Sequence, residues 1–170
     1  MSNQDKKISN EDTIALVKRF IASNERKRRN LISEIENSVE SLFELGDSLI
    51  IEFDRKGDDW SNGWILQVLK KYKPNFFEND NYNNWYYTNS GIDLNYYDLQ
   101  LNLLKQNFEE ADRLTSSYLR KLAGKVAENR GYVFYSEVKD MPGEDLVTID
   151  RLWNIYSHGK FGFSNQAKLL

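Results

Sequence analysis

The 170-residue sequence contains no cysteine, two prolines and a single histidine. Without cysteine the chain has no disulfide framework, no thiolate nucleophile and no cysteine metal site, which fits a reducing compartment better than secretion. One histidine cannot form a histidine metal cluster. His158 lies between Ser157 and Gly159, and this setting predicts an exposed turn residue rather than an axial ligand or an acid/base group.

Long hydrophobic runs are also missing. The longest dense apolar run, Leu49-Ile50-Ile51, stops at Glu52, far short of the roughly 20 residues that cross a bilayer. The segment from Met1 to Asn10 is polar, lacks the apolar stretch of a signal peptide, and is not rich in arginine and serine like a transit peptide. These features predict a soluble protein.

An excess of positive charge is absent as well, because the formal net charge is −3. Proteins that bind nucleic acid usually present a basic face that releases counterions, so no nucleic-acid partner is expected. The one basic cluster is Arg26-Lys27-Arg28-Arg29. It is typical of a solvated helix end or linker, with contact to an acidic partner or a membrane surface as the alternative.

The common signatures of catalysis and cofactor binding are not found either, including the phosphate-binding glycine loops, H-E-x-x-H and the acidic calcium loop. Asp112, Asp145 and Asp150 could supply the carboxylate pair that general acid/base catalysis needs, but nothing in the sequence forces any two of them together. Helix capping and salt bridges are commoner roles for such residues. We therefore expect no enzyme activity and no metal site.

Apolar residues recur at helical spacing over most of the chain, and no strands recur, which predicts an all-α fold. A small N-terminal helical unit is expected over residues 1–74, with breaks near Ser23-Asn24, at Gly46 and at 56–59, and with Pro74 at its end. Residues 75–91 are rich in asparagine and aromatic residues and predict a linker. Its aromatic side chains are expected to pack onto neighbouring elements, because base stacking would need a positive groove and the stretch contains no lysine or arginine.

A second helical unit is expected over residues 92–170. Its clearest helix follows Phe108 and can end at Gly124, and another is indicated by the spacing of Leu146, Ile149, Trp153 and Tyr156. The segment 132–135 has high strand propensity, but it is short and has no pairing partner. We interpret it as a loop, with a helical turn as the alternative.

Three ordered stretches of this second unit carry a family resemblance. They read AD-x-x-T, DL-x-x-I-D-x-LW and YS-x-G-K-FGFS-x-Q, and in order and spacing they resemble the motifs of the genomes-uncoupled-four family of tetrapyrrole-binding proteins. The N-terminal helices resemble, more weakly, the extension found in cyanobacterial and red-algal members. The residues that carry the three motifs are Ala111, Asp112, Thr115, Asp145, Leu146, Ile149, Asp150, Trp153, Tyr156, Ser157, Phe161, Gly162, Phe163, Ser164 and Gln166.

These signature residues are interpreted first as architecture. Trp153, Tyr156, Phe161 and Phe163 are what a helix junction would bury, and Gly162 would let the following turn close.

The resemblance implies a compact, cupped helical domain that binds protoporphyrin IX or magnesium-protoporphyrin IX and stimulates magnesium chelatase through its large H subunit. It implies a regulator in the plastid stroma or the cyanobacterial cytoplasm that can touch membranes peripherally, and we expect a monomer.

A flat macrocycle binds best between apolar walls, and its propionates bind to a cation or to backbone amides. The family's ligand loop corresponds to 125–138, with five candidate residues, of which Arg130 is the candidate propionate partner and the others are candidate walls: Val126, Arg130, Tyr132, Phe134 and Tyr135.

Family members continue beyond FGFS-x-Q with a further segment that forms the opposite side of the porphyrin cup. The sequence stops at Leu170, so the resemblance predicts a domain truncated at its C-terminus, with weaker porphyrin binding if the chain is complete. The alternative function is a helical protein-interaction module that binds no pigment.

Overall fold

A computed structural model describes residues 9–77 and 85–169 of the chain, and every regular element in these residues is a helix. The predicted all-α fold is thereby confirmed. The elements are α1 (Asn10–Ala22), α2 (Glu25–Asn37), α3 (Val39–Leu45), α4 (Asp47–Ile51), α5 (Trp60–Tyr72), the short 3₁₀ helix η1 (Pro74–Phe77), α6 (Tyr97–Leu104), α7 (Phe108–Leu122), α8 (Lys125–Arg130), α9 (Tyr135–Val138), α10 (Gly143–Tyr156) and α11 (Phe163–Ala167).

Side-chain caps start three of the N-terminal helices where the sequence places polar residues. The backbone amide of Asp12 donates to the Ser9 hydroxyl at 3.1 Å, that of Lys27 to the Asn24 side chain at 3.0 Å, and that of Ser61 to the Asp59 carboxylate at 2.7 Å. Such caps satisfy amides that have no partner within the helix. The breaks predicted near Ser23-Asn24 and before residue 60 are confirmed.

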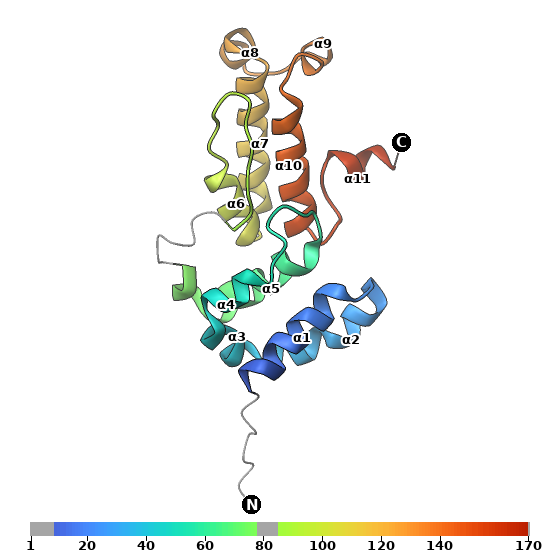
Figure 1. The fold of residues 1–170 in the computed structure, drawn as a ribbon. Coiled ribbons are helices and arrows are strands. Elements are labelled where there is room, and N and C mark those ends of the chain that lie inside the picture. Colours follow the sequence, from blue (N-terminus) through green and yellow to red (C-terminus); the bar gives the residue numbers. More distant parts are fainter. Residues whose placement is uncertain (1–8, 78–84, 170) are drawn as a thin grey trace, which may run out of the picture.

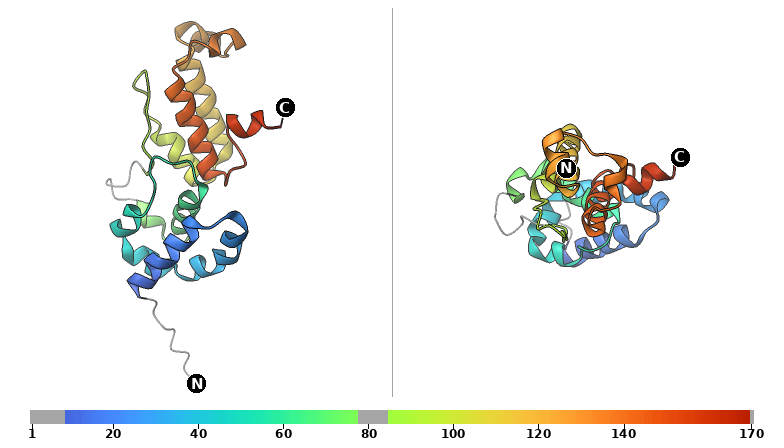
Figure 2. Two further views of the ribbon diagram at one scale, coloured as in Figure 1. Left: turned by 45° about the vertical axis from the view of Figure 1, so that its right-hand side comes forward. Right: turned by 90° about the horizontal axis from the view of Figure 1, so that it is seen from above.

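Helices α7 and α10 form the frame of the C-terminal half and lie side by side (Figures 1 and 2). Acidic residues occupy the first turn of α7 and basic residues its last turn, which favours the helix through its dipole. The Trp153 indole N–H on α10 donates to the Thr115 hydroxyl on α7 at 2.9 Å. Helices α8 and α9 cover one end of this pair, and α5 crosses the other end (Figure 1).

A continuous cluster of buried side chains runs from α1 to α10 and joins the two halves of the chain. Its centre is the contact of α5 with α10, where a side chain at Gly63 would come within 2.6 Å of the Ile155 Cγ2 atom. Gly63 thus lets the two backbones approach closely. The amide of Gln67 on α5 also donates to the Tyr156 carbonyl at 2.9 Å. Each half therefore contributes side chains to the same core.

Two aromatic residues of the predicted linker are part of that core. Trp85 and Tyr86 are buried, and the Tyr86 amide and carbonyl both bond to the Gln100 side chain. The predicted packing of linker aromatics onto neighbouring elements is confirmed for these two. Tyr82 lies outside the described residues.

Two interpretations of charged or titratable residues were wrong. Arg28, predicted on a solvated helix end, is only 6% exposed, because its guanidinium bonds to the carbonyls of Phe20 and Ile21 and to the Asp59 carboxylate. His158 does lie in a turn, with φ of 57°, but it is half-buried rather than exposed. Its Nε2 atom lies 2.8 Å from Gln67 Oε1, and its ring packs on Trp60.

Candidate ligand-binding pocket

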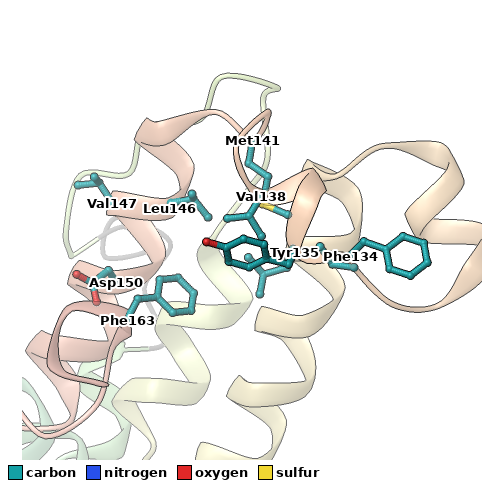
Figure 3. A pocket seen from close by; sticks show the side chains of 10 residues that line it. Phe134, Tyr135, Val138, Met141, Leu146, Val147, Asp150 and Phe163 are labelled. Carbon is teal, nitrogen blue, oxygen red and sulfur yellow. The ribbon is translucent and has the colours of Figure 1, made fainter. Parts of the chain in front are cut away.

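A cavity of about 690 Å³ opens between α9, α10 and the start of α11. In Figure 3 the rings of Tyr135 and Phe163 border the same space, whereas Phe134 points outward, away from Asp150. We call this cavity the apolar pocket. Its lining consists of Leu119, Val133, Phe134, Tyr135, Val138, Met141, Leu146, Val147, Asp150 and Phe163.

The lining is almost entirely aliphatic or aromatic. Asp150 is its one ionisable acid, and among its lining residues none is a lysine or arginine. Two apolar side chains on the rim are left largely in water, since Tyr135 is 95% exposed and Val147 is 65% exposed. Exposed apolar side chains that gather around a concave site mark a place where another molecule binds.

Helix α10 supplies one wall through the helical repeat. Leu146 and Val147 precede Asp150 by four and three residues, and this spacing brings them to the same side of the helix as Asp150. The helix begins after Pro142, whose fixed φ suits a helix start, and the preceding Met141 is buried and lines the pocket. The DL-x-x-I-D motif therefore contributes three lining residues: Leu146 and Asp150 at its fixed positions and Val147 at a variable one.

Asp150 and Gly162 set the position of Phe163. The Asp150 carboxylate accepts a hydrogen bond from the Ser164 amide at 3.0 Å. Gly162 has φ of 119°, and a Cβ atom there would lie 2.6 Å from Asp150 Oδ1. Only glycine fits this approach without strain, so the two residues together hold the turn that brings Phe163 to the pocket.

Of the five residues predicted from the ligand loop, Phe134 and Tyr135 line the pocket. Val126, Arg130 and Tyr132 do not belong to its lining. In the segment 132–135, predicted as a loop, residues 132–134 are irregular as expected, whereas Tyr135 begins helix α9. The loop 125–138 also contains the short helix α8. The Arg130 guanidinium is engaged within the loop, because it bonds to the Glu137 carboxylate at 2.6 Å and to the Tyr132 carbonyl at 3.0 Å.

A second, smaller cavity of about 260 Å³ adjoins the first and shares Phe163 with it. We call it the aromatic pocket. Phe108, Trp153 and Phe161 pack against one another there, with ring centroids 5.6 to 6.0 Å apart. Phe161 and Phe163 were expected to be buried in a helix junction, and this was wrong: they are 44% and 37% exposed because they line open cavities. The aromatic pocket is lined by Phe108, Asp112, Thr115, Trp153, Phe161, Gly162, Phe163 and Gln166.

Other signature residues lie inside the fold. Asp145 is fully buried and accepts hydrogen bonds from the Tyr96 hydroxyl at 2.6 Å and the Gly91 amide at 2.7 Å. Burial and the Asp145 carboxylate raise the pKa of the Tyr96 hydroxyl well above its usual range. Tyr156 and Ile149 are also buried, and Ala111 is buried on α7. These residues fix the helices that border the pockets.

Five lining residues were not singled out from the sequence: Leu119, Val133, Val138, Met141 and Val147. Leu119 is one of the apolar residues at helical spacing in the helix expected after Phe108, and Val147 falls at a variable position of its motif. These five residues have the same pattern of apolar and polar neighbours in the sequence as core residues do. No sequence signal therefore distinguished pocket residues from core residues. The close approach of α9 to α10 is what makes them pocket residues.

The described helices include none long and apolar enough to span a bilayer. Within the same residues, no three histidine, aspartate or glutamate side chains gather closely enough to hold a metal ion. The ionisable groups discussed above instead bond to tyrosine, arginine or backbone partners.

The C-terminal half of the chain is similar to known proteins. Residues 89–170 match the model of a family described as GUN4-like. A tetrapyrrole-binding, chloroplastic protein of Arabidopsis thaliana is 48% identical over 71 residues, which is 42% of this chain and 27% of that protein. An uncharacterised protein ycf53 of Porphyra purpurea is 44% identical over 80 residues, covering 47% of this chain and 34% of that protein.

A Ycf53-like protein of Synechocystis is 46% identical over 79 residues, 46% of this chain and 33% of that protein. The match therefore spans about a third or less of the length of these curated relatives. The structure of GUN4 from Chlamydomonas reinhardtii aligns with a TM-score of 0.48 and 36% identity, over 49% of this chain and 55% of that chain. The C-terminal half of this chain, which holds both pockets, is thus similar to the family described as GUN4-like.

Proposed function

We propose that the chain binds a porphyrin in the apolar pocket and acts as a non-enzymatic regulator. The observation that carries this proposal is the pocket itself: about 690 Å³ of space with aliphatic and aromatic walls. Ligand pockets typically measure about 300–1,000 Å³ and are mostly apolar, with few polar groups. A flat, largely apolar macrocycle suits such walls, and the name of the Arabidopsis relative supports a tetrapyrrole as the ligand.

The finer parts of the proposal extend from the likeness of the C-terminal half to the GUN4-like family. The ligand is protoporphyrin IX or magnesium-protoporphyrin IX, and the regulated enzyme is magnesium chelatase, contacted through its large H subunit. The protein works in the plastid stroma or the cyanobacterial cytoplasm, as a monomer that can touch membranes peripherally. The chloroplastic and cyanobacterial relatives support this location.

The alternative function is a helical protein-interaction module that binds no pigment. The exposed apolar side chains Val126, Tyr135 and Val147 favour it, because such residues are also typical of protein interfaces. Pigment titration separates the two functions.

The test is a titration of the purified chain with deuteroporphyrin and its magnesium form, followed by quenching of tryptophan and tyrosine fluorescence. Saturable binding at micromolar or lower concentration is expected. Tyr135→Ala should weaken it about two- to tenfold, because an aromatic contact contributes roughly 0.5–1.5 kcal/mol. Val147→Asp should weaken it further by placing a charge on an apolar wall.

Both substituted positions are exposed, so the variants are expected to keep the fold, which circular dichroism checks. Tyr72→Ala is the matched control, because Tyr72 is an exposed tyrosine on α5, outside the residues that match the GUN4-like family. Absence of saturable binding by the folded wild-type chain would overturn the proposal and favour the interaction module.

A further inference from the structure

The wall of the pocket that carries Tyr135 is held by an unusual set of contacts around one arginine. The Arg130 guanidinium, at the end of α8, bonds to the Glu137 carboxylate of α9 at 2.6 Å. It donates to the Tyr132 carbonyl at 3.0 Å and lies over the Phe134 ring, 4.0 Å from its centroid. Glu137 in turn accepts a hydrogen bond from the Phe134 amide at 2.7 Å. We call this set of contacts the Arg130–Glu137 clamp.

The clamp closes the segment that joins α8 to α9. Arg130 lies before the segment and Glu137 after it, and both bond to backbone groups inside it. The two side chains are sheltered, with 19% and 25% of their surfaces exposed. Charged hydrogen bonds in such a setting are stronger than those of a fully solvated pair.

Helix α9 has few other anchors. It is four residues long, and none of its side chains, all of them described, is buried. A helix this short is not stable by itself in water. Its orientation, and with it the position of Tyr135, therefore depends on contacts at its ends, of which the clamp is the main polar set.

The ionised form of Glu137 is favoured in this arrangement. The Phe134 amide, and after it the Arg130 guanidinium, lower the pKa of the Glu137 carboxyl below its usual value. The clamp is therefore charged on both sides at neutral pH. An arginine engaged in this way has less capacity to pair with a ligand carboxylate.

We propose that Arg130 is a positioning residue: through Glu137 it fixes the Tyr135 wall of the apolar pocket, and it supports ligand binding without touching the ligand. This inference rests on the proposed porphyrin-binding function. It differs from the role that family resemblance suggests for Arg130, which is direct pairing with a propionate.

The test compares two ligands on a double-mutant cycle. Deuteroporphyrin, which has two carboxylates, and its uncharged dimethyl ester are titrated against wild type, Arg130→Ala, Glu137→Ala and the double variant, in the same detergent solution. Each single variant should weaken both ligands about three- to tenfold, and the double variant should weaken them no more than either single one, because coupled residues are not additive. Arg130→Lys should fall between wild type and Arg130→Ala, since lysine keeps the charge but not the planar fork.

The matched control is the Arg113–Glu110 pair on α7, another arginine–glutamate pair, whose residues do not line the apolar pocket. Alanine at either position should leave both affinities unchanged. Loss of diacid binding alone in Arg130→Ala, with normal binding by Glu137→Ala, would show direct propionate pairing and overturn the inference. Wild-type affinity in both single variants would overturn it too, whereas a wild-type chain that binds neither ligand would instead defeat the proposed function.

Discussion

Gly162 shows how a single residue controls the geometry of the site. Its φ of 119° is strained for any side chain, and a Cβ atom would also lie 2.6 Å from the Asp150 carboxylate. We expect Gly162→Ala to lower the free energy of unfolding by about 2 kcal/mol or more, through backbone strain and this contact. Urea unfolding followed by circular dichroism measures the loss.

The comparison for that variant is Gly124→Ala. Gly124 has φ of 96°, but a Cβ atom there would meet nothing within 4 Å. The difference between the two alanine variants isolates the contact with Asp150 from the strain that both share. Equal losses of unfolding free energy in the two variants would mean that the Asp150 side chain moves away from the new Cβ atom without a loss of stability.

At the scale of elements, Arg28 connects three helices. From α2 it bonds to carbonyls at the end of α1 and to Asp59 at the start of α5, and it lies over the Trp60 ring at 5.0 Å. Replacing it removes a donor from the Phe20 and Ile21 carbonyls and from the Asp59 carboxylate and leaves a cavity in its buried site, so Arg28→Ala should cost about 2–4 kcal/mol of unfolding free energy. Arg29→Ala should change it by less than about 0.5 kcal/mol, because its pair with Glu25 is exposed. Similar losses in both variants would show that the buried position of Arg28 adds nothing.

The sequence predicted elements better than it predicted the surroundings of particular side chains. The helical repeat and the terminators Gly46 and Gly124 located α7, α10 and the N-terminal breaks, because helix formation depends on local spacing and caps. The burial of Arg28 and the exposure of Phe161 could not be predicted, since both depend on helices distant in the sequence. For the pocket, the ligand loop supplied Phe134 and Tyr135, but Leu119 and Met141 required the approach of α7, α9 and α10.

At the scale of the whole molecule, His158 lies at the junction of the two halves. The side-chain amide N–H of Gln67 donates to the Tyr156 carbonyl, so the Gln67 Oε1 atom faces His158 Nε2. Because Oε1 can only accept a hydrogen bond, His158 Nε2 carries the proton of the neutral imidazole. Burial, and then the charge of Lys160, lower the pKa of the His158 imidazole below its usual value of 6.5. As the pH falls, His158 therefore becomes protonated at a higher pH in the unfolded chain than in the folded one. Stability from this site is present above about pH 6.5 and is lost as the pH drops from there toward the lower folded-state pKa.

The measurement is urea unfolding at pH 7.5 and 5.5 for wild type and His158→Gln. Wild type should lose more stability between the two values than the variant does, since glutamine does not titrate. The carboxylates are common to both proteins and cancel in the comparison. An identical pH dependence in the two proteins would contradict a lowered pKa for His158.

The close contact of α5 with α10 also bears on how this protein can be divided. The segment that matches the GUN4-like family model starts at residue 89. Ile65, Leu66 and Leu69 of α5 nevertheless lie in the same buried cluster as Leu103, Ile155 and Tyr156. A fragment cut at residue 89 would turn that face of α10 toward water, an apolar surface of the kind that drives proteins to associate. The family-model match and the buried core therefore have different borders in this chain, and recombinant fragments are better started before α1.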